Sequence, residues 1–134
     1  MAVYKLFPNK SATLYSKDPD KNTGLDPIIE AYNRTHLTDI FISNAEVARY
    51  LIAFDQTEIN DVINNKISGS QWQANLKNFI ASATGIVADS SLYVYPVAQE
   101  WTNGTGQEKH DPETENGVSW SWLTYNGGTR WQTG

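Results

Sequence analysis

The chain has 134 residues, about the size of one domain, and its 40% hydrophobic residues can form a core. The net charge is −5 and no run of Lys or Arg occurs, so we expect neither nucleic acid nor an anionic membrane surface as a partner. The absence of cysteine excludes disulfides, thiolate metal sites and cysteine nucleophiles, and no apolar stretch approaches the roughly 18 residues of a membrane-spanning helix.

Alternating apolar and polar residues predict several short strands in the first third of the chain. Residues 2–7 and 11–15 form the first two strands, and residues 28–34 form a third. A polar connection follows, with a further short strand at residues 39–43. This part of the chain is therefore expected to be sheet.

The loop after the second strand carries four oxygen-bearing side chains close together: Asp18, Asp20, Asn22 and Asp26. Such oxygens are ligands that calcium prefers. The glycine and the bidentate glutamate of the EF-hand spacing are missing, however, so a solvated turn is the favoured interpretation. His36 and His110 are far apart, and no third ligand can be named for a metal between them.

The clearest strand covers residues 47–55. One of its faces is uniformly apolar and is predicted to face the core: Ala48, Tyr50, Ile52 and Phe54. Arg49 is predicted on the outer face, where pairing with Glu46 or Asp55 is favoured over a ligand-binding role.

Residues 56–66 are the one good helix candidate. Ile59, Val62 and Ile63 have the spacing of an amphipathic helix. Thr57 is the expected N-terminal cap, and Gly69 lies just beyond the expected end. The helix is short, so packing must stabilise it.

Two further strands are predicted before the C-terminal part. Residues 72–82 alternate and then lose phase, which indicates a strand with a bulge. Residues 91–97 form a clear strand, with Leu92 and Val94 on one side and Tyr93 and Tyr95 on the other. Pro96 places this strand at a sheet edge or a bulge.

Residues 101–131 hold four of the five tryptophans and five of the nine glycines. A glycine turn at residues 101–106 is followed by an acidic loop, and residues 118–123 form a strand. A hairpin turn at residues 126–128 leads into another strand. Many short strands with frequent turns and one helix predict an all-β, antiparallel β-sandwich of the jelly-roll type, as a single domain over residues 1–134.

Six motifs carry a family resemblance: Asn-Thr-Gly at 22–24, RYLIAFD at 49–55, SLYVY at 91–95, WTNGTG at 101–106, GVSW at 117–120 and GTRWQTG at 128–134. Together they resemble the DNRLRE-type domain, a jelly roll similar to carbohydrate-binding modules. The chain is also similar to structural proteins of tailed phages, especially marine and cyanobacterial ones. Asn103 stands where the family turn has an acid, which puts any role of that acid in doubt.

The family domain usually continues beyond the position of Gly134. We therefore expect either the N-terminal segment of a longer protein or a sheet that a neighbouring subunit completes, with a docking point at the C-terminal end. The residues expected in that assembly contact are Gly128, Thr129, Arg130 and Trp131.

The resemblance implies a non-enzymatic virion protein, an adaptor or decoration subunit of the tail, neck or capsid, assembled in the host cytoplasm. Its expected partners are other virion proteins and copies of itself. The alternative is an adhesion module on a tail fibre that binds a host surface glycan through exposed aromatic rings. The candidates are Trp122, Tyr125, Trp120, Trp131 and Trp101, although packing in the core is the favoured role for any single tryptophan.

An enzyme is the least favoured class. Glu108, Asp111, Glu113 and Glu115 could supply a carboxylate pair, but they share one polar loop without apolar neighbours to raise a pKa. Neither histidine has the context of a nucleophile elbow. No catalytic residue and no cofactor are therefore expected.

Overall fold

The structure is a computed structural model that describes residues 3–38, 42–67, 69, 71–85 and 91–132. It consists mostly of strands in antiparallel sheets with one short helix, so the prediction of a small all-β fold is confirmed at that level. Within these residues, no helix is long and apolar enough to cross a membrane.

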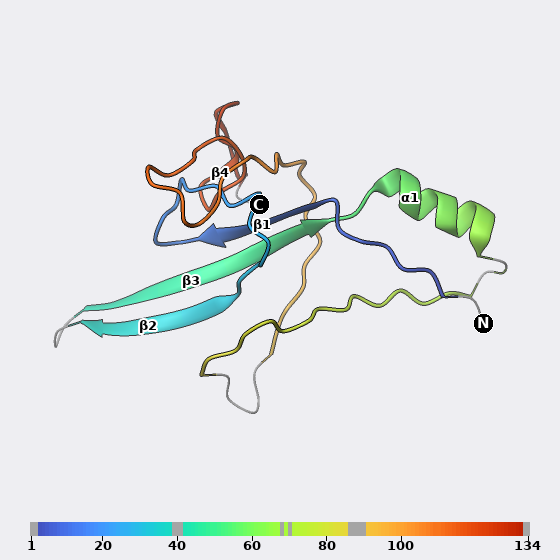
Figure 1. Cartoon of the computed structure of the whole chain (residues 1–134), viewed down its shortest axis with the longest axis horizontal. Coiled ribbons are helices and arrows are strands. Elements are labelled where there is room, and N and C mark those ends of the chain that lie inside the picture. The colour runs from blue at the N-terminus through green and yellow to red at the C-terminus, as the bar shows by residue number, and fades with distance from the viewer. Residues whose placement is uncertain (1–2, 39–41, 68, 70, 86–90, 133–134) are drawn as a thin grey trace.

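A three-stranded antiparallel sheet forms the centre of the molecule, in the order β1-β3-β2 (Figure 1). Strand β1 covers Lys10–Tyr15, β2 covers Tyr32–Thr38 and β3 covers Ile42–Ala53. A two-stranded hairpin of β4 (Trp122–Thr124) and β5 (Thr129–Arg130) lies beyond β1. The predicted strand at residues 39–43 lies partly outside the described residues, and β3 begins at its end.

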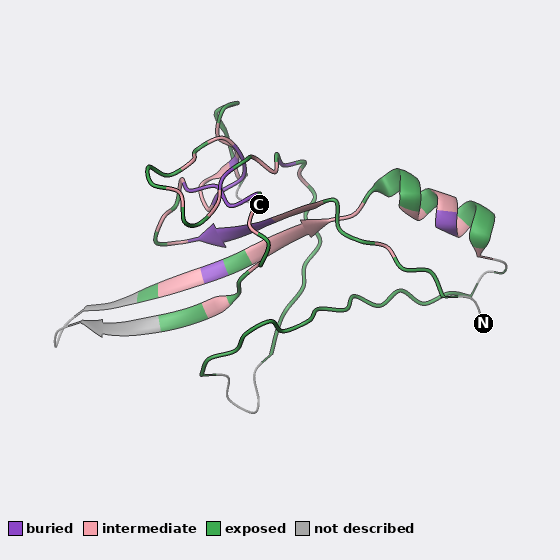
Figure 2. Ribbon diagram, in the orientation of Figure 1, coloured by how far each residue is buried: buried purple, intermediate pink, exposed green. Residues whose placement is uncertain are grey.

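The core lies between the β1-β3 face and the C-terminal segment. Its buried members are Ala12, Leu14, Trp101, Val118 and Leu123, and Leu51, Ala53, Trp120 and Trp131 pack against them. Figure 2 shows this burial concentrated in β1 and in the loops beside β4.

The predicted core face of β3 is only partly correct, because both faces of the strand are partly buried. Strand register places Ala12 opposite Leu51 and Lys10 opposite Ala53, so Leu51 and Ala53 face the cluster. On the predicted face Ala48 is buried and Tyr50 and Ile52 are half-buried, and Leu51 and Ala53 on the opposite face are half-buried as well. Both faces of β3 carry apolar side chains, and the choice between them depends on where the tryptophans of the C-terminal segment pack.

Arg49 lies opposite Leu14 of the cluster in the register of β1 and β3, and its own side chain is exposed. Its guanidinium carbon is 5.1 Å from the centre of the Trp120 ring, a cation–π contact. Lys17 Nζ lies 3.6 Å from a carboxylate oxygen of Glu46, one of the two acids predicted to pair with Arg49.

The helix agrees with prediction in position but not in its cap. Helix α1 covers Gln56–Asp61 and continues as a π-helical turn at Val62–Lys66, in which Val62 is buried. The side chain of Asp55, rather than Thr57, accepts hydrogen bonds from the first backbone N–H groups. These hydrogen bonds lower the pKa of Asp55.

Three predicted strands are absent from the described structure. Residues 3–7, 72–82 and 91–97 have no strand pairing, and their large apolar side chains are mostly exposed. A strand requires a neighbour for its backbone N–H and C=O groups, and none is supplied to these segments. Figures 1 and 2 show residues 71–85 and 91–100 as a long exposed excursion from the sheet, between the helix and the C-terminal part.

Candidate functional site

The motifs at 22–24, 101–106 and 117–120 converge on one buried side chain. The Nδ2 atom of Asn22 donates to the carbonyl oxygens of Asn103 and Val118, each at 2.8 Å. Its Oδ1 accepts from the N–H groups of Gly106 at 2.7 Å and Gly24 at 3.3 Å. The carboxamide is fully buried, and each of its hydrogen-bonding positions is used.

Four glycines make this junction possible. An added Cβ on Gly104 would overlap the Asn22 side chain, and one on Gly106 would overlap the Asn22 carbonyl. An added Cβ on Gly24 or on Gly117 would likewise overlap backbone atoms of the 103–104 turn. The glycine spacing of these three motifs therefore serves close backbone packing around Asn22. This role of Asn22 was not predicted; its only sequence signals were the nearby Gly24 and the glycine pair of the later turn.

Side chains cover the outer edge of β1. The Thr23 hydroxyl accepts from the Thr13 N–H and donates to the Thr13 carbonyl, both at 2.7 Å. Asn103 Oδ1 accepts from the Ser11 N–H at 3.1 Å, while its Nδ2 donates to the Gly24 carbonyl at 2.6 Å. Asn103 thus uses both halves of its amide, which an acid at this position could not do when ionised.

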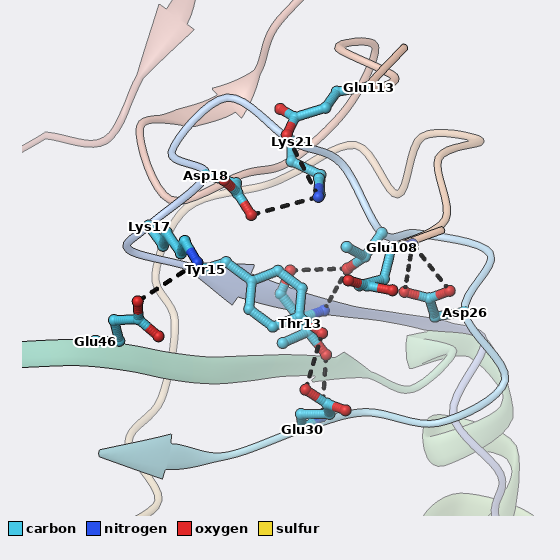
Figure 3. A network of polar contacts seen from close by, with 11 residues as sticks. Thr13, Tyr15, Lys17, Asp18, Lys21, Asp26, Glu30, Glu46, Glu108 and Glu113 are labelled. Carbon is cyan, nitrogen blue, oxygen red and sulfur yellow. Dashed lines mark hydrogen bonds and ion pairs between the residues drawn. The ribbon is translucent and has the colours of Figure 1, made fainter. Parts of the chain in front are cut away.

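A polar network lies above β1 (Figure 3). Lys21 is nearly buried, and its Nζ lies 3.3 Å from both Asp18 and Glu113. Burial lowers the pKa of Lys21, but the hydrogen bonds and charges of these two carboxylates outweigh it, so the pKa is raised. Burial, followed by the charge and hydrogen bond of Glu30, raises the pKa of Tyr15.

The four calcium candidates turn to different partners. Asp18 pairs with Lys21, and Asp20 accepts from the Trp122 indole Nε1 at 2.7 Å. Asn22 belongs to the buried junction, and both carboxylate oxygens of Asp26 accept from the Glu108 N–H. Among the described residues, no three or more His, Asp or Glu side chains gather closely enough to hold a metal ion.

The glycan-binding candidates divide between the core and a half-buried aromatic group. Trp101 is buried in the core, and Trp131 donates from Nε1 to the Ser119 carbonyl at 3.0 Å. Trp122 meets Tyr125 edge-on with ring centres 5.3 Å apart, and the Arg130 guanidinium carbon is 4.0 Å from the Trp122 ring centre. One face and the N–H of Trp122 are therefore already in contact with other side chains.

The predicted assembly residues lie at the β4-β5 hairpin. Gly128 takes a positive φ in its turn, and Thr129 and Arg130 form β5, where both are exposed. Trp131 follows and packs against the core cluster. These residues are close together, with Arg130 held against Trp122.

The acidic loop does not bring its carboxylates to one centre. Glu113 pairs with Lys21, and Glu115 hydrogen-bonds to Tyr125, which raises the pKa of that phenol. A shallow depression is lined by Asp26, Pro27, Gln107, Glu108 and Lys109. Its lining contains no nucleophile beside a base. The His110 ring lies 2.9 Å from the Thr114 hydroxyl, while the side chain of His36 lies outside the described residues.

Most of the exposed large apolar side chains lie on the excursion. Phe79 is 92% exposed, and Tyr93 and Tyr95 are 75% and 76% exposed. Trp72, Leu76, Ile80, Leu92, Val94 and Val97 are also exposed. Contiguous exposure of this kind marks an interaction surface.

No family model, curated protein or solved structure matches this chain.

Proposed function

We propose that this chain is a non-enzymatic structural subunit of a tailed-phage virion, an adaptor or decoration protein that acts through protein–protein contacts. The observation that carries the proposal is the apolar excursion of residues 71–85 and 91–98, in which each residue is exposed. The virion assignment is supported by the motif resemblance, because the motif residues at 22–24, 101–106 and 117–120 form one buried junction.

The excursion favours assembly on energetic grounds. Apolar surface removed from water contributes about 25 cal/mol per Å². Rings such as Phe79, Tyr93 and Tyr95 make no use of this contribution while they are exposed. A partner that covers these rings makes their burial stabilise the complex. A loop that stays in solvent would be expected to carry polar residues at these positions instead.

The jelly-roll sandwich belongs to the same proposal. Residues 72–82 and 91–97 have the sequence pattern of strands but lack neighbours. When a partner subunit pairs with them, they become strands, and the sheets of β1-β3-β2 and β4-β5 gain the members that a sandwich needs. Completion of the domain and assembly of the particle would then be one event.

Glycan binding is the weaker proposal. A sugar needs an open aromatic face with polar groups at its rim. Trp122 and Tyr125 have such groups nearby, but Arg130 covers a face of the Trp122 ring. A glycan array probed with this protein and with a Tyr125→Ala variant is expected to give equal, background signals; strong binding lost in the variant would favour adhesion.

Lysine-directed cross-linking of intact particles tests the assembly proposal. Lys77 is the one lysine in residues 71–98. We expect it to cross-link to other virion subunits, whereas Lys109, beside the shallow depression, serves as the reference surface lysine. Purified particles without this chain, or particles in which Lys77 forms no intersubunit cross-link while Lys109 does, would overturn the proposal.

A further inference from the structure

The two edges of the central sheet differ. Strand β1 has its outer edge covered by Thr23 and Asn103, which hydrogen-bond to the backbone of Thr13 and Ser11. Strand β2 forms the other edge. Among the described residues, the backbone hydrogen bonds outside the strand pairing do not involve β2. An open edge of this kind accepts an additional strand.

The same chain carries an unpaired strand of matching length. Strand β2 has seven residues, and residues 91–97 are also seven. The segment has no charged residue. It is rich in aromatic and β-branched residues, which favour strands. In Figure 1 the gold trace of this region runs across the direction of β2 rather than along it.

We propose that residues 91–97 of one copy add as a fourth strand to the outer edge of β2 in a second copy. The inference rests on the proposed assembly function and names the partner as the chain itself. The added strand and the edge that receives it are on the same polypeptide. Identical copies can therefore supply each other with the missing neighbouring strand. A contact of this kind is head-to-tail and closes into a ring when the rotation between copies allows.

Pro96 determines the hydrogen-bonding phase of the added strand. Successive residues of an edge strand direct their backbone groups alternately toward and away from the neighbouring strand. Pro96 has no N–H, so it must lie in the outward set with Val94. Tyr93 and Tyr95 then direct their N–H and C=O groups to β2. The outward proline also discourages a further strand from pairing beyond this one.

Proline substitutions test this phase. Tyr93→Pro removes an inward N–H, and Val94→Pro, the matched control, removes an outward one. Analytical ultracentrifugation of the full chain should show an oligomer whose dissociation constant rises at least about tenfold in Tyr93→Pro. The dissociation constants of Val94→Pro and Tyr93→Ala should stay much closer to that of the parent. Both positions lie outside the core cluster, so the circular dichroism of the monomer should be the same in all three variants and the parent.

Cysteine trapping tests the pairing between copies, because the chain has no native cysteine. One preparation carries Asn33→Cys on β2, and the other carries a single cysteine at 92, 93, 94 or 95. Mixing should give intermolecular disulfides with one alternate set, either 92 and 94 or 93 and 95, since side chains alternate along a strand. A monomeric parent, an equal rise of the dissociation constant in both proline variants, or the absence of disulfides between the two preparations would overturn the inference. The Lys77 cross-links in particles test the assembly function separately, and their presence beside any of these results would leave that function standing.

Discussion

Asn22 Oδ1 accepts a 2.7 Å hydrogen bond from the N–H of Gly106, a residue 84 positions later in the chain. This bond is one of four that the buried carboxamide makes, and the others reach Gly24, Asn103 and Val118. One side chain therefore connects the loop after β1 to both C-terminal turns. The position of the hairpin relative to the sheet depends on it.

Asn22→Ala is expected to destabilise the fold by about 3 kcal/mol or more, because buried groups on Gly106, Asn103 and Val118 lose their partner. Urea unfolding followed by tryptophan fluorescence measures this, since Trp101 lies in the core beside the junction. Asn126→Ala, at an exposed turn position, is the matched control and should change the free energy of unfolding little. Equal effects of the two substitutions would contradict a central role for Asn22.

A pair of glycines separates backbone strain from steric overlap. Gly104 and Gly128 both have positive φ, at 78° and 62°. A Cβ on Gly104 would meet the Asn22 side chain, whereas a Cβ on Gly128 meets nothing within 4 Å. Gly128→Ala should cost about 1 kcal/mol from strain alone, and Gly104→Ala should cost roughly 2 kcal/mol more. Thermal unfolding of both variants measures which substitution destabilises the fold more. A smaller loss of stability in Gly104→Ala than in Gly128→Ala would contradict the close packing of Gly104 against Asn22.

The sequence predicted β1 and the second half of β3, whereas the strands expected at residues 28–34 and 118–123 overlap β2 and β4 only in part. Residues 11–15 and 47–53 alternate and pair with each other, as β1 and the end of β3. Residues 72–82 and 91–97 alternate as well but remain unpaired, because periodicity reports suitability for a sheet rather than the presence of a neighbour. The single helix was predictable from its apolar spacing.

The candidate site was less predictable because it depends on contacts between distant residues. Asn22 resembled a calcium ligand when compared only with its local neighbours. Three of its four hydrogen-bond partners lie more than 80 residues away. The prediction for β3 was incomplete for a related reason, since Leu51 and Ala53 on the opposite face pack against a cluster that includes residues from the far end of the chain.

Asn103→Asp replaces the amide in the 101–106 turn by a carboxylate and is expected to destabilise this chain. The new carboxylate keeps its hydrogen bond from Ser11 but cannot donate to the Gly24 carbonyl when it is ionised. We expect a loss of about 1–3 kcal/mol at neutral pH. Chemical unfolding at neutral and acidic pH measures it, and the difference from the parent should shrink in acid, where the protonated acid can donate. A variant as stable as the parent at neutral pH would contradict the assigned role of the amide.

Tyr15 should make the protein sensitive to alkaline pH. Burial, and then the charge and hydrogen bond of Glu30, raise its pKa above the ordinary value of 10.0. The folded state therefore holds the phenol proton at pH values where the unfolded chain has lost it, and stability is fully present below about pH 10 and falls above it. Lys21, whose pKa is also raised, acts in the same direction.

The free energy of unfolding, measured between about pH 9 and 11.5, should fall less steeply in Tyr15→Phe than in the parent, because phenylalanine has no proton to lose. Tyr95→Phe changes a phenol that is 76% exposed and should keep the parental slope. Some alkaline dependence should persist in Tyr15→Phe through Lys21, whose amine is held between Asp18 and Glu113. Parallel slopes for the parent and Tyr15→Phe would show that the Tyr15 phenol is not held in its neutral form by the fold.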